Sequence, residues 1–339
     1  MTAKLMTPNA PAAPARPATI WFALITVYLV WGSTYLAIRV VVETAPPLMS
    51  MGARFLLAGT LLGLFLAARH GISVLRVSWR QLASTGLVGV LLLLCGNGAV
   101  AIGEQTVPSG LAALLVAAVP LWLVCLRVAA GDRPRALSLA GTVLGFLGIA
   151  VLARPGGHDG DIETWGLLMI VGATIAWALG SFFSSRLPMP RNAFVATTWE
   201  MVIGGGLMLP TGMLRGELDG FHLGSVSGEA WAWLAYLVVF GSLAAFTAYV
   251  WLLQNAPISL TATYAYVNPV VAVALGALVL AEPITTAIVL GGLVVVLGVG
   301  LVVSTERPRR APPAPASGAV PETVLEPDLN RASTARSQG

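Results

Sequence analysis

Ten long apolar stretches, joined by short polar connections, constrain this chain more than any other feature of its sequence. About 20 apolar residues in a helix cross the ~30 Å hydrocarbon layer of a bilayer. Because no water reaches that layer, a crossing segment must satisfy its own backbone hydrogen bonds, as a helix does. We therefore predict an all-α integral membrane protein with ten transmembrane helices, at approximately Thr19–Val42, Pro47–Ala67, Leu82–Gly103, Pro108–Ala130, Arg135–Ala153, Trp165–Ser185, Asn192–Leu214, Ala230–Leu253, Pro257–Leu280 and Pro283–Val303.

The charge content agrees with this interpretation. Only 10% of the residues are charged and 57% are hydrophobic, whereas a soluble domain has about 25% charged residues. A surface so poor in charge cannot face water on all sides. The chain is therefore expected to lie in lipid.

Several functional classes lack the residues that they need. Lys4 is the only lysine, so no lysine follows the glycines of a nucleotide-binding P-loop. Cys95 and Cys125 lie in apolar stretches and offer neither a disulfide framework nor a zinc-binding spacing. The three histidines lie in separate loops: His70, His158 and His222. We therefore expect no enzyme activity and no metal or other cofactor. Basic residues are scattered among short loops, so we also expect no nucleic-acid partner.

Basic residues are distributed unequally between the two sides of the predicted membrane domain. If the N-terminus is cytoplasmic, most Lys and Arg fall on the cytoplasmic side, whereas acids such as Asp159, Glu217 and Glu229 fall in outer loops. Basic loops tend to stay in the cytoplasm. We therefore predict a multi-pass protein of the cell (inner) membrane with both termini cytoplasmic.

The two halves of the chain carry matching residues in the same order. Trp31, Arg54 and Gly59 recur at a constant spacing as Trp177, Glu200 and Gly205, and Gln105, Pro108, Pro120 and Pro134 recur at a slightly larger spacing as Gln254, Pro257, Pro269 and Pro283. A unit of five helices crosses the membrane an odd number of times, so the second copy enters from the opposite side. We predict two inverted five-helix repeats, 19–153 and 165–303, around a central cavity, with disordered cytoplasmic tails at 1–18 and 304–339. Inverted repeats recur in secondary transporters.

Two motifs stand out in the first half of the sequence. The first is Trp31-Gly32-Ser33-Thr34-Tyr35 with Ala53-Arg54-Phe55, and the second runs from Glu104-Gln105-Thr106-Val107-Pro108 to Pro120-Leu121, with Asn268-Pro269-Val270 and Ala281-Glu282-Pro283 as second-half counterparts. Together they resemble the EamA-type transporters of the drug/metabolite transporter superfamily. The resemblance covers roughly residues 20–303 and implies ten helices, a central cavity, and export of metabolites such as amino acids or of toxic compounds. Glu104 departs from the pattern, since many members look less charged at this position.

Prolines fall at matching depths in two predicted helices. Pro120 and Pro269 each lie about 18 Å along their span, near the midplane from opposite sides. Each proline removes an N–H and frees a carbonyl group. Both are candidate helix kinks, which either line a binding cavity or only adjust packing.

Arg54 and Glu200 place charges inside the hydrocarbon layer, where they should face the protein interior. The rise of their helices puts them about 8 Å apart along the membrane normal. Three roles stay open: a structural ion pair between the two, binding of the carboxylate and ammonium of an amino-acid-like substrate, and proton coupling by Glu200.

Polar and aromatic side chains recur on single faces of three predicted helices. Buried hydroxyl and amide groups need partners, so these faces should point inward. Helix packing is the alternative explanation for most such residues. The candidate cavity residues are Trp31, Tyr35, Trp177, Ser181, Tyr264 and Asn268, with Asn97 in the third span.

Glycines also recur at helical spacing in the fifth and tenth predicted spans. Gly141 and Gly145 form a GxxxG motif, and Gly291, Gly298 and Gly300 give the tenth span a small face. Small residues let helix backbones approach closely. The pattern favours tight packing, either within the chain or in a homodimer.

These features favour a secondary transporter without an ATP motor, which exports a small metabolite or a toxic compound by alternating access. Its partners would be a small-molecule solute, membrane lipids and, if transport is proton-coupled, protons. The alternatives are a lipid flippase and an integral-membrane enzyme. A flippase needs a lateral opening, and an enzyme needs its acid, base or metal ligands on one side of the membrane.

Overall fold

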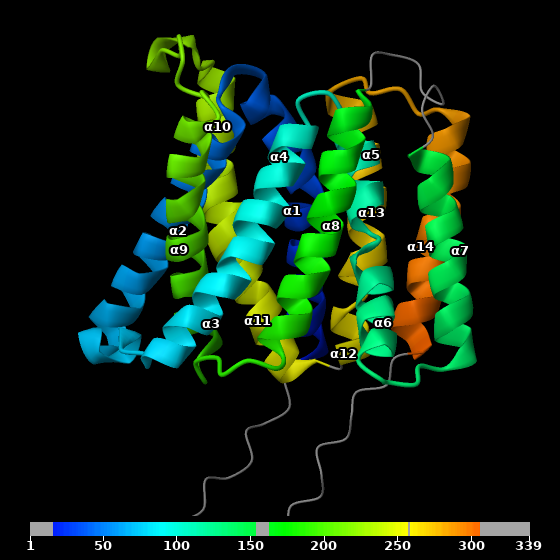
Figure 1. Cartoon of the computed structure of the whole chain (residues 1–339), viewed down its shortest axis with the longest axis horizontal. Helices are drawn as coiled ribbons and strands as arrows, with labels where there is room; N and C mark the ends of the chain where they lie inside the picture. The colour runs from blue at the N-terminus through cyan, green and yellow to red at the C-terminus, as the bar shows by residue number, and fades with distance from the viewer. Residues whose placement is uncertain (1–15, 154–162, 257, 306–339) are drawn as a thin grey trace, which may run out of the picture. The chain divides into compact units, whose positions relative to one another are not determined.

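The computed structural model consists of helices that run side by side, with no strand among the residues it describes (Figure 1). It describes residues 16–153, 163–256 and 258–305. The predicted disordered tails lie almost wholly outside these ranges. The first helix begins at Pro17 and the last ends at Thr305, so the innermost residues of both predicted tails are helical.

Each predicted span coincides with one helix or with a run of consecutive helices. The first five spans correspond to α1 (Pro17–Thr44), α2 (Pro47–His70), the run α3–η2–α4 (Trp79–Gly89, Val90–Gly98, Ala99–Gly103), the pair α5–α6 (Ser109–Val116, Val119–Ala129) and α7 (Ala136–Leu152). The other five correspond to α8 (Thr164–Ser184), α9 (Ala193–Leu214), the run α10–η4–α11 (Gly228–Tyr236, Leu237–Ala244, Ala245–Asn255), the pair α12–α13 (Ile258–Thr261, Tyr264–Val279) and α14 (Thr286–Thr305). Short 3₁₀ turns, η1 (Ile72–Leu75) and η3 (Leu223–Ser225), lie in the connections.

The helices carry the surface of a multi-pass membrane protein. Eight of the described helical runs are long and apolar enough to cross a membrane. Large apolar side chains stand on their outer faces, and Phe22, Leu64 and Leu297 are 72%, 62% and 61% exposed, an arrangement that suits lipid better than water. Since α7 and α13 are apolar but shorter, the count of ten crossings stays a prediction.

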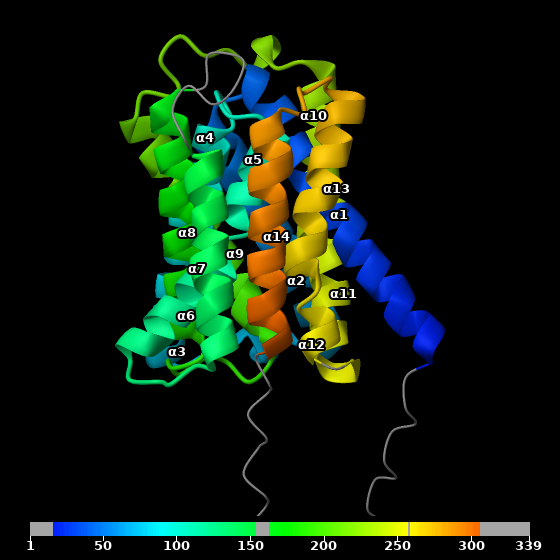
Figure 2. The ribbon, with the colours of Figure 1, turned by 90° about the vertical axis from the view of Figure 1, so that its right-hand side faces the viewer.

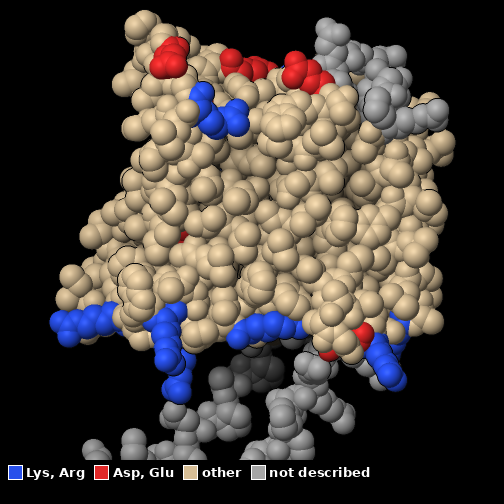
Figure 3. Space-filling view, in the orientation of Figure 1, with Lys and Arg blue, Asp and Glu red and all other residues tan. Residues whose placement is uncertain are grey.

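Charged side chains gather at the two ends of the helices. In Figure 3, basic side chains lie mostly at one end and acidic side chains mostly at the other, with an uncharged band between them. The basic end is the one where α2 ends and α3 begins, and the acidic end is the one where α1 ends and α2 begins (Figure 1). The broad uncharged band between the ends is where hydrocarbon would contact the protein.

Polar caps start several of the helices. The Ser78 hydroxyl accepts a hydrogen bond from the Gln81 backbone at 3.3 Å, and the Gln81 side chain accepts one from the Ser78 backbone at 3.0 Å, which forms a capping box at the start of α3. Asn192 caps α9 through the Phe194 N–H at 2.9 Å. Such caps satisfy the backbone donors that a helix start leaves free.

Glycines bring α7 and α14 into backbone contact, side by side in both views (Figures 1 and 2). A methyl group added at Gly298 would lie 2.5 Å from the Gly145 backbone nitrogen and 2.7 Å from the Gly141 carbonyl oxygen. On the other side of the bundle, one added at Gly205 of α9 would lie 2.8 Å from the Leu56 backbone nitrogen of α2. The predicted GxxxG motif therefore serves packing within the chain.

The two proline positions differ in their effect. The run α5–α6 is interrupted at Ala117–Ala118, and Pro120 occupies the first turn of α6, where a helix tolerates proline. By contrast, α13 continues through Pro269, and the break in that run lies earlier, at Ala262–Thr263. The expected interruption is thus found beside Pro120 but not at Pro269. One lost hydrogen bond does not end a helix that its neighbours hold in place.

The backbone contact of α7 and α14 predicts a strong effect of a single methyl group. We expect Gly298→Ala to lower the free energy of unfolding by about 1–3 kcal/mol, because no flexible side chain can move aside. Thermal unfolding of the purified protein in detergent measures the effect. Gly300→Ala is the matched control on the same helix, since no atom lies within 4 Å of the added methyl group. Equal unfolding temperatures for the two variants would contradict the close approach.

Candidate functional site

Arg54 places a positive charge inside the helix bundle. It projects from α2, and only 4% of its surface is exposed. Its Nε donates a hydrogen bond to the Ser242 hydroxyl at 3.0 Å, and Nη1 donates to the Met51 sulfur at 3.7 Å. No carboxylate of the described residues lies within ion-pair distance of Arg54. The guanidinium is therefore held in place but its charge is not neutralised.

The π-helical segment η4 receives polar groups from two other helices. The Trp31 indole of α1 donates to the Gly241 carbonyl at 3.2 Å, and Arg54 of α2 bonds to the next residue, Ser242. A π-helix shifts its carbonyl groups out of the regular ladder and is frequent at functional sites. The third span of the first half carries a π-helical segment as well, η2.

Aromatic rings surround the Trp31 side chain. The ring centroids of Tyr249 and Tyr264 lie 5.1 and 5.3 Å from that of Trp31, and 5.5 Å from each other. Offset and edge-on contacts at such distances stabilise an aromatic cluster. Trp31 thus belongs to the aromatic cluster and also binds η4, the segment to which Arg54 binds.

Glu200 is not paired with Arg54. Its carboxylate makes no hydrogen bond or ion pair with any described residue, and its side chain is partly buried. A methyl group at Gly89 would lie 2.6 Å from the Glu200 carbonyl oxygen, so this turn of α9 is pressed against the end of α3. Arg54 points instead to η4. The ion pair considered from the sequence is therefore not formed in this structure.

The other predicted cavity residues lie on the same interior helices. Trp177 packs against η2, where its ring atom Cε3 lies 2.9 Å from the position of a Cβ at Gly96, next to Asn97. Asn268 is buried, and its Oδ1 has no hydrogen-bond partner among the described residues. Tyr35 and Ser181 are partly buried. Trp31 and Tyr264 are thus in direct contact, whereas Trp177 and Asn97 belong to a second group at η2.

Glu104 is a buried carboxyl group that lies just after α4. The residue has 0% exposure, and neither carboxyl oxygen has a hydrogen-bond partner among the described residues. Nη1 of Arg39 donates to the Glu104 backbone carbonyl rather than to the carboxylate. Burial raises the pKa of Glu104 well above its ordinary value, and the charge of Glu282 raises it further, while Arg39 and Arg54 act in the opposite direction. From the sequence, Glu104 was notable only because it departs from the EamA-type motif.

Two other carboxylates cap helix starts at the acidic end. The Glu282 carboxylate accepts hydrogen bonds from the Ser109 backbone at 2.7 Å, the Ser109 hydroxyl at 3.1 Å and the Gly110 backbone at 3.0 Å, at the start of α5. Glu217 accepts from the Leu48 and Met49 backbones at 2.9 and 3.1 Å, at the start of α2. The sequence analysis missed both, because a cap supplied by a distant segment leaves no local pattern.

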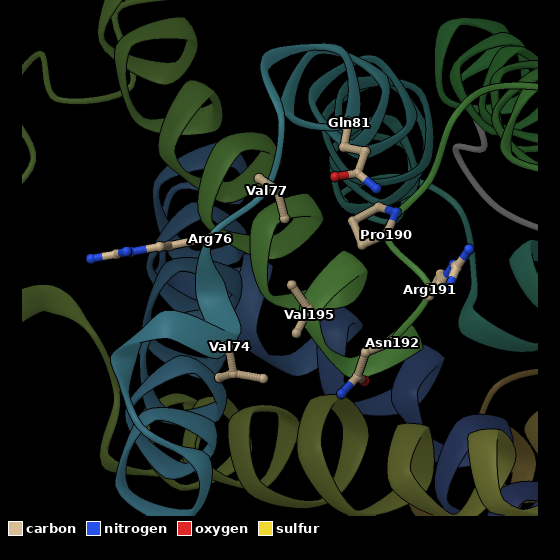
Figure 4. A pocket seen from close by; sticks show the side chains of 8 residues that line it. All are labelled: Val74, Arg76, Val77, Gln81, Pro190, Arg191, Asn192 and Val195. Atoms are coloured by element: carbon tan, nitrogen blue, oxygen red, sulfur yellow. The ribbon is translucent and has the colours of Figure 1, made fainter.

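A hollow at the basic end is separate from these residues. It has a volume of about 240 Å³ and lies between the connections α2–α3 and α8–α9. In Figure 4, Gln81, Pro190 and Asn192 border it, whereas the Arg76 side chain points away. None of the predicted cavity residues lines it. No three His, Cys, Asp or Glu side chains are grouped for metal binding within the described ranges.

Comparison with known proteins places these features in a family. The sequence matches the EamA-like transporter family over residues 18–154 and again over 164–304. The uncharacterized inner membrane transporter YedA of Escherichia coli (strain K12) is 43% identical over 256 residues, which cover 75% of this chain and 80% of that protein. The uncharacterized transporter YvbV of Bacillus subtilis (strain 168) is 25% identical over 304 residues, covering 85% and 93%. The resemblance found in the sequence motifs is confirmed.

One further protein and one solved structure are also similar to this chain. A probable amino-acid metabolite efflux pump of Salmonella typhimurium (strain LT2) is 27% identical over 187 residues, which cover 54% of this chain and 60% of that protein. One solved crystal structure matches 85% of this chain and 96% of its own, with a TM-score of 0.57 and 20% identity. At that identity, the likeness shows a shared fold.

The raised pKa of Glu104 predicts that the stability of the protein depends on pH. Below the ordinary pKa of 4.5, the carboxyl is protonated in both the folded and unfolded states, and its contribution to stability is complete. As pH rises through the raised pKa, the folded state loses that contribution. Glu104→Gln cannot ionise, so we expect its melting temperature to fall less than that of the wild type between acidic and alkaline buffers. Parallel pH profiles for the two proteins would contradict this assignment.

Proposed function

This chain belongs to the EamA-like transporter family, and from that premise we propose that it is a secondary transporter that exports a small metabolite, such as an amino acid, or a toxic compound. The observation that carries the proposal is Arg54, a buried guanidinium that has no ion-pair partner within the described ranges and lies near an aromatic cluster. An unpaired charge at membrane depth costs free energy unless a ligand or a water-filled cavity stabilises it. Arg54 would attract the carboxylate of a solute, and Trp31 and Tyr264 would contact its apolar part.

The proposed binding region combines residues from both halves of the chain. It comprises Trp31, Tyr35, Arg54, Asn97, Trp177, Ser181, Glu200, Tyr264 and Asn268, beside the break near Pro120. Asn268 supports the proposal because its buried Oδ1 lacks a partner among the described residues. A solute with donor groups would satisfy such an acceptor.

We propose ten crossings arranged as two inverted repeats, 19–153 and 165–303, with both termini in the cytoplasm. Two separate family matches support a repeat, as do π-helical segments in the third span of each half. The basic end of the helices supports a cytoplasmic location for that end. Exchange of the two halves' conformations would then open the interior alternately to each side.

We favour export of an amino-acid-like solute over import, because one relative is a probable amino-acid metabolite efflux pump. An outward flux against a gradient needs an energy source, and no P-loop lysine is available for ATP. We therefore propose coupling to protons.

Efflux from proteoliposomes tests the proposed function. Vesicles loaded with radiolabelled leucine, phenylalanine, threonine or ethidium would be diluted into buffer with and without a pH gradient. We expect at least one solute to leave faster from vesicles that contain the protein than from empty vesicles, because the interior offers a cationic and aromatic site. Movement of a fluorescent phospholipid between leaflets, with no solute flux, would instead indicate a lipid flippase.

Glu200→Gln separates a transport role of this carboxylate from a structural one. We expect the variant to fold normally and to transport at least about tenfold more slowly, a change of 1.4 kcal/mol in the barrier, because glutamine cannot exchange a proton. Glu229→Gln is the matched control, since Glu229 is exposed at the start of α10, where it accepts a hydrogen bond from the Trp233 indole at 3.3 Å. Transport by Glu200→Gln at the wild-type rate would remove Glu200 from the mechanism.

A further inference from the structure

Glu104 lies where the backbone leaves no space for water. The preceding residue, Gly103, is so close to α8 that an added methyl group would lie 2.6 Å from Ile170 and 2.8 Å from the Gly166 carbonyl oxygen. The carboxyl group itself has no exposed surface. Neither a solute ammonium group nor a hydrated ion fits beside it in this conformation, so a proton is the one ligand small enough to bind there.

Few charged groups face Glu104, and most of these have other partners. From α1, Tyr35 and Arg39 approach it, from α2 Arg54, and from the α13–α14 connection Glu282. The helix α8 contributes no titratable side chain. Arg39 donates to the Glu104 carbonyl and lies 3.8 Å from the Glu43 carboxylate. Arg54 bonds to Ser242.

Glu104 and Glu282 form a pair of carboxyl groups with opposite surroundings. Glu282 accepts three hydrogen bonds from the start of α5. Glu104 accepts none from the described residues. When two nearby carboxyl groups repel each other, the proton is held by the one with fewer donors. Both geometry and charge therefore place the proton on Glu104.

We propose that Glu104 is a proton-binding site of this protein, protonated while the acidic end is closed around it. When the contacts between Glu282 and the start of α5 separate, water reaches the carboxyl group and the proton leaves to form hydronium, with the carboxylate left near Arg39 and Arg54. Binding reverses this step. The coupling role of the site rests on the proposed transport function, whereas its protonation does not.

Infrared spectroscopy tests the proton site without any solute. The full-length protein in lipid vesicles at neutral pH should show a protonated-carboxyl band that is lost in Glu104→Gln and retained in Glu229→Gln. In Glu282→Gln, we expect the band to disappear at a lower pH than in the wild type, because the repelling charge is gone. This second variant decides the question if Glu104→Gln fails to fold. An unchanged band in Glu104→Gln, or an unchanged titration in Glu282→Gln, overturns the proposal.

Efflux of radiolabelled leucine tests the coupling role. An inward proton gradient should accelerate leucine efflux several-fold in the wild type and in Glu229→Gln but not in Glu104→Gln, which should still exchange leucine without a gradient. The coupling role is overturned if the proton gradient does not change the efflux rate of the wild type, or if it accelerates efflux by Glu104→Gln. If the wild type moves no tested solute, the proposed transport function fails, and the infrared result still decides whether Glu104 holds a proton.

Discussion

Hydrocarbon offers no hydrogen bonds, so each polar group between the basic and acidic ends of the helices must find its hydrogen-bond partner within the protein. Most hydroxyls are satisfied locally. Ser50 and Thr142 donate to carbonyl groups one turn earlier, at 2.7 and 2.8 Å. The exceptions include Arg54, Glu104, Glu200 and Asn268, whose charges or acceptors lack a full set of partners among the described residues, and the buried Ser138 Oγ and Glu217 Oε1 also lack a hydrogen-bond partner there. Burial of charged groups without partners is costly, which makes the charged members of this set candidates for binding a ligand or a proton.

Close backbone packing complements this polar interior. Glycines allow the backbone of α2 to approach α9 and that of α7 to approach α14, and these are the helices that correspond in the proposed repeat. The polar contacts lie elsewhere, between α1, α2 and the π-helical segment η4. The glycine contacts and these polar contacts therefore involve different groups of residues.

Sequence reasoning succeeded where a single local property decides the structure. Runs of apolar residues predicted where the long helical runs lie, and the charge of Arg54 predicted its interior position, because burial of backbone and charge follows from lipid alone. It failed where distant segments meet. Nothing near Glu217 or Glu282 indicates that each caps a helix from another part of the chain, and Glu104 became significant only when its neighbours were known. Pro269 shows the converse, since a local helix breaker is overruled by its surroundings. The separation of Arg54 from Glu200 depended on side-chain direction, which helix rise does not give.

The capping carboxylates also explain how one end of the molecule could open while the helices stay together. Glu217 and Glu282 both follow the first-half family match in sequence, yet they bind helix starts of the first half, α2 and α5. A helix start carries free N–H groups and a partial positive charge, which attract a carboxylate. At the acidic end, water can replace that carboxylate at each donor, whereas no water can replace the glycine contacts at membrane depth. In the proposed opening, separation at this end would exchange one set of hydrogen bonds for another, and the same movement would admit water to Glu104.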